Sequence, residues 1–250
     1  MSADPILLRG HHITRRWGGL VAVNDVSIEL ARGEVHAVIG TNGAGKSTLI
    51  NILSGEIPPS SGQVELLGQD VTGWSQPRRA RAGLGRSYQR NTIYPSFTVM
   101  ENCRLAAQAA WQRPWRWWES ARHCTQSNEA ARQAAHSAGL TDFLAHTAGL
   151  LSHGQKRQLE IAMCLATSPQ VLLLDEPLAG MGAEETERML ELLAQLRRDH
   201  AVLLVEHDMD AVFRIADRIT VMVNGAVIAS GTPQAIRDNA EVQSAYLGGH

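Results

Sequence analysis

Residues 40–48 read Gly-Thr-Asn-Gly-Ala-Gly-Lys-Ser-Thr, which fits the spacing G-x-x-x-x-G-K-[ST] of a phosphate-binding loop. Glycines let the chain turn tightly, so that backbone amides can point at phosphate oxygens. Lys46 is suited to neutralise the β- and γ-phosphates of a nucleotide, and the Ser47 hydroxyl is suited to bind Mg²⁺. The expected nucleotide contacts from this phosphate loop are Gly40, Asn42, Gly43, Ala44, Gly45, Lys46, Ser47 and Thr48.

The elements around the phosphate loop are those that such a site requires. A β-rich run at 34–39 precedes the loop, and residues 46–54 suit a helix that ends before Gly55. This order places free N–H groups and the positive end of a helix at the phosphates. A glycine-rich turn that contains a lysine by chance is the alternative, and the flanking strand and helix argue against it.

Two adjacent carboxylates, Asp175 and Glu176, follow an apolar run at 171–174. At the end of a strand, Asp175 is suited to hold Mg²⁺ and Glu176 is suited to polarise an attacking water. Capping of the next helix by these acidic residues is the alternative. Pro177 follows them directly, which makes capping less natural.

Strand and helix signals alternate through the second half of the chain, which indicates an α/β fold. Strands are expected at residues 171–174, 201–205, 218–223 and 226–230, with helices at 184–198 and from Pro233. The opening is strand-rich instead, with β-rich runs at 6–13 and 23–30 around a Gly18-Gly19 turn.

Between about residues 95 and 168 the strand pattern gives way to sequence rich in alanine, glutamine and arginine. This composition predicts a helical insert within the α/β body. We therefore expect one domain over residues 1–250, with a body formed by 1–94 and 169–250 and a helical subdomain at about 95–168.

Net charge, apolar content and cysteine spacing limit the classes of protein to which the chain can belong. The formal net charge of −2 argues against a nucleic-acid interface, because such proteins usually carry a strong basic excess. No window approaches the ~20 apolar residues that span a bilayer, and the N-terminus lacks the layout of a signal peptide. The sequence therefore predicts a cytoplasmic chain. Its three cysteines are scattered and are expected to be reduced thiols.

The peptide Leu-Ser-His-Gly-Gln at 151–155 resembles the signature peptide of ATP-binding-cassette ATPases, with His153 where glycine is commoner. The Ser152 hydroxyl and the Gly154 amide at a helix start are suitable anion donors, and with Gln155 they are expected to contact nucleotide. An ordinary N-capped helix is the alternative. The order of this peptide before Asp175 and Glu176 matches the family.

The resemblance covers essentially the whole chain and implies the finer architecture. It implies a P-loop NTPase-type cassette with a mixed sheet core, an N-terminal antiparallel β subdomain and the helical insert. Three smaller elements fall in the family's order. Gln89 matches the glutamine that touches Mg²⁺ and the attacking water, His207 matches the switch histidine at the γ-phosphate, and Trp17 matches an aromatic that stacks on adenine.

Finer details resemble the ATPases of branched-chain amino acid and urea importers. The peptides that carry this likeness include residues 17–23, 98–102, 206–209 and 245–248. One departure is Gly182, where many cassettes have an aspartate that contacts the second cassette. The cargo follows from none of these residues directly, because none touches transported substrate.

The family architecture implies that two cassettes, identical or paralogous, meet head to tail. Each phosphate loop then holds MgATP against Ser152 and Gly154 of the other cassette. Glu176 would activate water, helped by Lys46, Gln89 and His207. The implied Mg²⁺ ligands are Ser47, Gln89 and Asp175.

The resemblance also implies partners and a location. The partners are integral-membrane permease subunits and, indirectly, a periplasmic solute receptor, with the chain peripheral at the cytoplasmic face of the inner membrane. An ATPase for lipid or lipopolysaccharide export, a non-transport cassette protein and a P-loop kinase are the alternatives. The tryptophan-rich segment 111–118 could contact a membrane surface, although a packed or solvated loop is the simpler interpretation.

Overall fold

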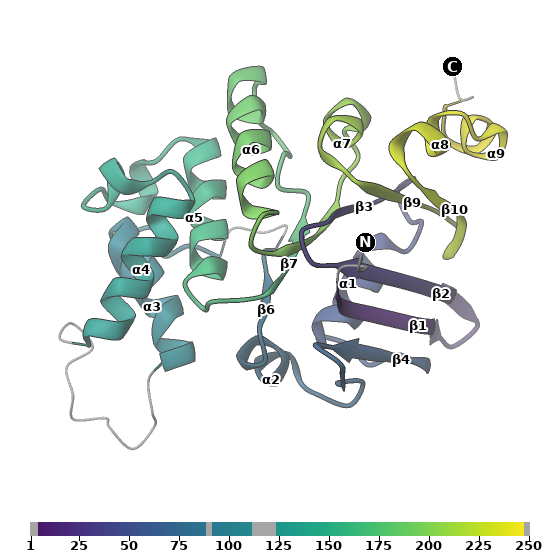
Figure 1. Ribbon diagram of the computed structural model, residues 1–250, viewed down its shortest axis with the longest axis horizontal. Coiled ribbons are helices and arrows are strands. Elements are labelled where there is room, and N and C mark those ends of the chain that lie inside the picture. Colours follow the sequence, from purple (N-terminus) through teal and green to yellow (C-terminus); the bar gives the residue numbers. More distant parts are fainter. Residues whose placement is uncertain (1–4, 89–91, 112–123, 248–250) are drawn as a thin grey trace.

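The computed structural model describes residues 5–88, 92–111 and 124–247. In this part of the chain, two sheets lie beside a group of helices that is set to one side (Figure 1). One sheet has six strands and is mostly parallel, and the other has four antiparallel strands. The mixed sheet, the antiparallel sheet and the helical insert are all present, which confirms the predicted fold class.

The larger sheet has the strand order β10-β9-β3-β8-β7-β6. Its strands are β3 (Val35–Gly40), β6 (Leu84–Arg86), β7 (Val171–Asp175), β8 (Ala201–Val205), β9 (Arg218–Val223) and β10 (Ala226–Gly231). All neighbours pair in parallel except β9 and β10. Every residue of β3, β7 and β8 is buried, as expected of strands that are covered on both faces. The carboxyl ends of these three strands therefore share one edge, next to the phosphate loop and Asp175.

The smaller sheet has the order β2-β1-β4-β5. Its strands are β1 (Ile6–Trp17), β2 (Leu20–Ala31), β4 (Ser61–Leu66) and β5 (Gln69–Asp70). The helix α1 (Lys46–Ser54) joins the two sheets, because its Ile50 and Leu53 belong to one apolar core with Leu8 of β1 and Leu173 of β7. This packing fixes the start of α1, and with it the phosphate loop, against both sheets.

A second apolar core lies on the other face of the larger sheet. The helices there are α6 (Ala183–Leu196), α7 (Met209–Ile215), α8 (Pro233–Arg237) and α9 (Ala240–Val242), and a π-helical turn follows at Gln243–Leu247. Met189, Leu193 and Leu196, which recur at helical spacing in the sequence, are buried in this core with Leu172 and Leu174 of β7. Burial of that stripe holds α6 against the strand that ends in Asp175.

Between β6 and β7, the described residues form helices but no strand. These helices are α3 (Val99–Trp111), α4 (Thr125–Ser137) and α5 (His153–Leu165), with 3₁₀ turns at Thr141–Phe143 and Ala148–Leu150, and the short α2 (Gln76–Arg81) precedes β6. Val99, Ala131 and Leu159 meet in a separate small core. The division into a body and a helical subdomain stays a prediction.

Two expectations concern the chain as a whole. Across the described ranges, no helix combines the length and the apolar character needed to cross a membrane. The three cysteines form no disulfide, in keeping with their scattered spacing. Residues 112–118 of the tryptophan-rich segment lie outside the described residues.

Candidate active site

The phosphate loop connects β3 to α1 and depends on glycine at two positions. A Cβ atom at Gly40 would lie 2.2 Å from the carbonyl oxygen of Met222, and one at Gly45 would lie 2.4 Å from that of Ala22. Gly45 is also the N-cap of α1, with φ at 100° in the left-handed region. Only glycine fits at both positions, so the backbone of the loop can follow a tight path that a side chain would block.

Lys46 is the first residue of α1, and its side chain is buried. Its Nζ donates hydrogen bonds to the carbonyl oxygens of Gly40, at 2.7 Å, and Thr41, at 3.1 Å. Burial lowers the pKa of Lys46, and the carboxylates of Glu176 and Asp175 act in the opposite direction. The ammonium group therefore lies on the phosphate loop within electrostatic range of both carboxylates.

Asp175 and Glu176 lie at the carboxyl end of β7. Asp175 is only 5% exposed, and burial raises its pKa against the lowering effect of Arg86. Glu176 has φ at 50°, a backbone strain of about 1–3 kcal/mol of the kind that clusters at active sites. Neither residue caps the next helix, because the N-cap of α6 is Gly182. The alternative of helix capping is therefore wrong.

His207 follows β8, and its Nδ1 lies 3.8 Å from Oε1 of Glu176. The histidine side chain is 58% exposed, whereas the Glu176 side chain is 22% exposed. Because β7 and β8 are adjacent and parallel, the residues that follow them meet at one edge of the sheet. The structure thus brings Lys46, Asp175, Glu176 and His207 together.

Glu206 is a residue that the sequence reasoning missed. Its side chain is fully buried, and it accepts hydrogen bonds from the backbone N–H groups of Leu178, at 2.8 Å, and His207, at 3.1 Å. Burial raises the pKa of Glu206, and these two amides act against that rise. One buried side chain therefore ties the loop after Glu176 to His207. Glu206 directly follows an apolar strand, as Asp175 does, and this position in the sequence could have identified it.

A nucleotide pocket of about 430 Å³ opens beside the phosphate loop. Its lining residues are Leu20, Val21, Ala22, Asn42, Gly43, Ala44, Gly45, Lys46, Ser47, Thr48, Glu176, Asn224 and Gly225. Trp17 does not line this pocket, and the guanidinium of Arg15 lies 4.1 Å from the centre of its ring. Stacking of Trp17 on adenine stays a prediction.

Two parts of the pocket wall were not expected from the sequence. One is the start of β2, residues 20–22, and the other is the turn at Asn224 and Gly225 between β9 and β10. The Gly225 N–H donates to the carbonyl oxygen of Ala44 at 3.0 Å, and the Gly225 carbonyl accepts from Asn24 N–H at 2.8 Å. This turn therefore fixes the phosphate loop to the antiparallel sheet. Its Asn-Gly dipeptide is a hairpin signal, but nothing local ties it to the loop.

The signature peptide begins α5 with a complete capping box. Ser152 is the N-cap, its Oγ accepts from the Gln155 N–H at 3.2 Å, and its own N–H donates to Gln155 Oε1 at 2.9 Å. His153 Nε2 lies 2.9 Å from the carbonyl oxygen of Ala179. Ser152, Gly154 and Gln155 do not line the nucleotide pocket of their own chain. Their contacts with nucleotide stay predictions.

Gln89 lies outside the described residues, and the described residues nearest to it, Tyr88 and Thr92, contact α5. Arg157 donates to the carbonyl oxygen of Tyr88 at 3.3 Å, and Glu160 accepts from the Thr92 N–H at 3.3 Å. Arg157 and Glu160 also form a buried ion pair at 2.9 Å. Burial raises the pKa of Glu160, and the Arg157 hydrogen bond opposes this rise. The helix that carries the signature therefore holds Tyr88 and Thr92, the described residues on either side of 89–91.

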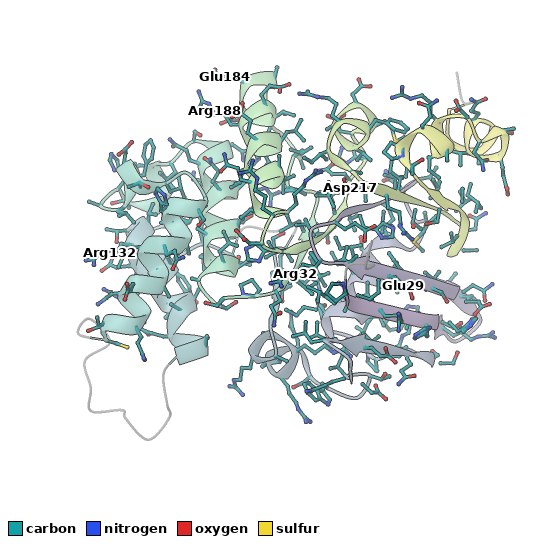
Figure 2. All side chains as sticks on the ribbon, in the orientation of Figure 1. Glu29, Arg32, Arg132, Glu184, Arg188 and Asp217 are labelled. Carbon is teal, nitrogen blue, oxygen red and sulfur yellow. The ribbon has the colours of Figure 1, made fainter. Side chains whose placement is uncertain are left out.

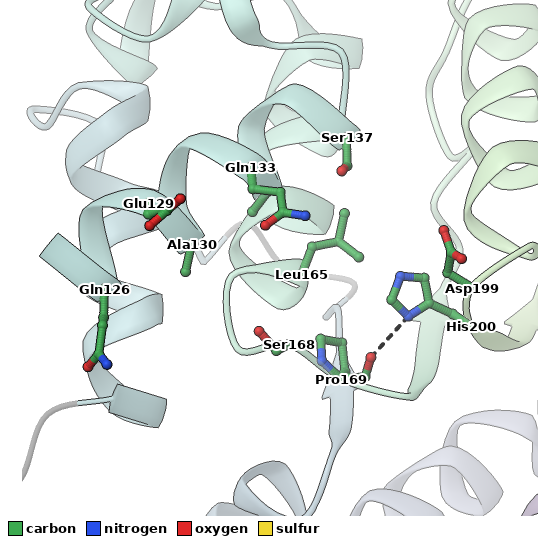
Figure 3. Close-up of a pocket in the computed structure, with 11 residues that line it drawn as sticks. Gln126, Glu129, Ala130, Gln133, Ser137, Leu165, Ser168, Pro169, Asp199 and His200 are labelled. Carbon is green, nitrogen blue, oxygen red and sulfur yellow. Dashed lines mark hydrogen bonds between the residues drawn. The ribbon is translucent and has the colours of Figure 1, made fainter.

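A second cavity, of about 500 Å³, lies between α4 and the segments that precede β7 and β8 (Figure 3). Gln133 and Leu165 face His200, whose Nδ1 is 3.0 Å from the Pro169 carbonyl oxygen. These segments are at the amino ends of the strands. The cavity is therefore separate from the chemistry at Asp175 and Glu176.

Comparisons with known proteins agree with this arrangement. Residues 23–179 match the family model described as ABC transporter, and residues 226–250 match one described as branched-chain amino acid ATP-binding cassette transporter. The crystal structure of the ADP conformation of MJ1267, an ATP-binding cassette of an ABC transporter, superposes with a TM-score of 0.88 at 28% identity. That match covers 98% of this chain and 100% of the other.

Two relatives are similar over nearly their whole lengths. The high-affinity branched-chain amino acid transport ATP-binding protein BraF of Pseudomonas aeruginosa is 40% identical over 243 residues, which cover 94% of this chain and 95% of BraF. The corresponding protein LivG of Escherichia coli is 39% identical over 250 residues, which cover 97% and 98% of the two chains. The resemblance to ATP-binding-cassette ATPases is confirmed. The chain belongs to the ABC transporter family and is an ATP-binding and ATP-hydrolysing cassette of that family.

Proposed function

We propose that this chain is the ATPase subunit of an importer for branched-chain amino acids or related small polar solutes such as urea or amides. The observation that carries this proposal is the similarity over 94–97% of the chain to BraF and LivG, whose names describe branched-chain amino acid transport. Residues 226–250 match a family model for branched-chain amino acid cassettes, which supports the same proposal. These likenesses do not favour lipid export.

The geometry supports a hydrolytic mechanism in which Glu176 is the general base. Its carboxylate lines the nucleotide pocket and lies 3.8 Å from His207. Lys46 would neutralise phosphate charge at the start of α1, and His207, beside Glu176, would contact the γ-phosphate. Glu176, whose backbone lies in the left-handed region, lines the pocket, whereas Asp175 is buried and does not line it.

Ser47, which lines the pocket, and Asp175, which directly precedes Glu176 of the pocket wall, suit a magnesium ion that is bound jointly with ATP. Mg²⁺ is usually held by one or two carboxylates together with substrate phosphates and waters. Ser47 lines the pocket, Asp175 is within electrostatic range of the adjacent Lys46, and no three His, Cys, Asp or Glu side chains converge in the described ranges. Ser47 and Asp175 would hold the ion with Gln89, and the ion would neutralise charge between the β- and γ-phosphates.

The nucleotide site is completed by a second cassette. Ser152 and Gly154 do not line the pocket of their own chain, and the start of α5 is a suitable place for an anion. A head-to-tail dimer, with an identical or a paralogous chain, brings each signature peptide to the ATP held by the other. Closure on ATP and reopening after hydrolysis then drive permease subunits at the cytoplasmic face of the inner membrane, and a periplasmic receptor delivers the solute.

Purification of the tagged chain from solubilised membranes tests this function. The expected result is co-elution of a multi-span permease, and uptake of radiolabelled leucine that is lost when the chain is deleted. Co-elution with ribosomes, with a DNA complex or with a lipid exporter, together with normal uptake in the deletion strain, would overturn the proposal.

A further inference from the structure

A carboxylate of the same chain already occupies the two hydrogen-bond donors of the signature peptide. Oε1 of Glu185, in the first turn of α6, accepts a hydrogen bond from Ser152 Oγ at 3.0 Å and from the Gly154 N–H at 3.0 Å. These are the two groups assigned above to the γ-phosphate of a partner's ATP. Hydrogen bonds from Gly154 first, and then from Ser152, lower the pKa of Glu185, so the side chain is a carboxylate at neutral pH.

The Glu185 carboxylate occupies the position beside the two donors that a second anion would need. A Cβ atom at Gly154 would lie 2.8 Å from the Glu185 carboxylate, and the cavity beside these groups measures about 10 Å³, near the lower limit for one water molecule. The Gly154 amide has a single hydrogen, which is already donated. A phosphate oxygen can therefore reach both donors only after the carboxylate leaves.

We propose that Glu185 is an internal substitute for the γ-phosphate, which occupies the signature peptide in the separated cassette and must be displaced before a dimer closes on ATP. This inference rests on the composite site proposed above. It makes the resting cassette self-inhibited, because each closure has to break two hydrogen bonds to a charged group on each side. A phosphate carries more charge and more acceptor oxygens than a carboxylate, so it can displace Glu185 from these donors.

The position of Glu185 connects this exchange to catalysis in its own chain. The loop at 178–182 runs from Glu176 to α6, and it is held at one end by Glu206 through the Leu178 N–H. His153 of the signature peptide contacts the Ala179 carbonyl oxygen of the same loop. Glu185 is therefore joined to the catalytic base by one short loop, which also contacts the signature peptide.

A capping role in α6 is the competing explanation. Glu185 is the third residue of the helix, and the Gly182 amide at the N-cap also lowers its pKa. The two explanations predict opposite effects on dimerisation. A cap that only stabilises the fold leaves ATP-driven dimerisation unchanged or weakens it when removed, whereas a competitor for the signature peptide strengthens dimerisation when removed.

The experiment measures dimer formation by sedimentation in rising MgATP, in chains that carry Glu176→Gln so that ATP persists. If membrane purification recovers a paralogous cassette, the two chains are mixed in equal amounts. Adding Glu185→Ala should lower the ATP concentration at half-dimerisation by at least about threefold to tenfold, the factor expected for removing even one of the two competing hydrogen bonds in each chain. Glu185→Gln, which keeps an acceptor oxygen but loses the charge, should give a smaller shift in the same direction.

Glu191→Ala is the matched control. Glu191 lies exposed farther along α6 and is not among the residues that line the cavity beside Ser152 and Gly154. Glu184 is less suitable, because it pairs with Arg188 (Figure 2), and Arg188 lines that cavity. Removal of Glu191 changes the net charge by the same amount as removal of Glu185 and should leave the midpoint unchanged.

An unchanged or higher midpoint in Glu185→Ala, or an equal fall in Glu191→Ala, would overturn the role of Glu185. If the alanine variant does not fold, the same outcomes in Glu185→Gln decide the question. Complete absence of an ATP-dependent dimer in the Glu176→Gln parent is a different result, because it contradicts the composite site itself.

Discussion

Removal of the Glu206 carboxylate should weaken both the fold and the catalytic edge of the sheet. The side chain is fully buried and accepts from two backbone amides, Leu178 N–H and His207 N–H. Each buried donor that loses its acceptor costs about 1–3 kcal/mol, so Glu206→Ala should lower the free energy of unfolding by about 2–6 kcal/mol. Glu206→Gln keeps one acceptor oxygen and should cost about half as much.

Urea unfolding followed by circular dichroism measures these stabilities. Glu191→Ala is the control, because Glu191 lies exposed on α6, and it should change the free energy of unfolding by less than about 0.5 kcal/mol. In the folded variants, kcat for ATP hydrolysis should fall more than the affinity for ATP, since Glu206 does not line the nucleotide pocket. Equal stability of the wild type and both Glu206 variants would refute the reasoning, as would a loss of ATP affinity with unchanged kcat.

Three further predictions concern the site and the core. Glu176→Gln should keep ATP binding in a filter assay and lower the hydrolysis rate at least about 100-fold, and normal turnover would remove Glu176 as the base. Gly40→Ala should lower the free energy of unfolding by about 1–3 kcal/mol and impair ATP binding, because its Cβ would lie 2.2 Å from the Met222 carbonyl oxygen. Burial lowers the pKa of His36 from 6.5 to about 4, so this group stabilises the fold above pH 6.5 and loses about 2 kcal/mol of that stability by pH 5. A His36→Gln variant should show a flatter fall in urea stability over this range, and an unchanged slope would contradict the assignment.

The elements that the sequence predicted best have strong local patterns. The helix at 46–54 and the strands at 201–205 and 218–223 have the predicted bounds, because an apolar run or a glycine stop marks each end. The hairpin was predicted too short, with strands at 6–13 and 23–30 in place of Ile6–Trp17 and Leu20–Ala31. Its outer half carries few buried residues, so hydrophobic pattern does not reveal it there.

The residues of the candidate site also fall into two groups, those that local sequence predicted and those that it did not. The phosphate loop, Asp175 and Glu176 were predicted from contiguous residues that carry their own chemistry, and the structure brings them to one edge of the sheet. Residues 20–22 and the turn at 224–225 were missed, because they reach the pocket only through the pairing of distant segments. Glu185 was missed for the same reason, since its contact with the signature peptide joins residues 31 and 33 positions apart.

The position of the γ-phosphate in the Glu176→Gln protein with MgATP, seen by crystallography or electron cryomicroscopy, tests the central claim most directly. We predict a dimer in which the γ-phosphate contacts Lys46 of one cassette and both Ser152 and Gly154 of the other, with Glu185 displaced from those donors. A γ-phosphate held by Lys46 while Ser152 and Gly154 still bind Glu185 would contradict the composite site.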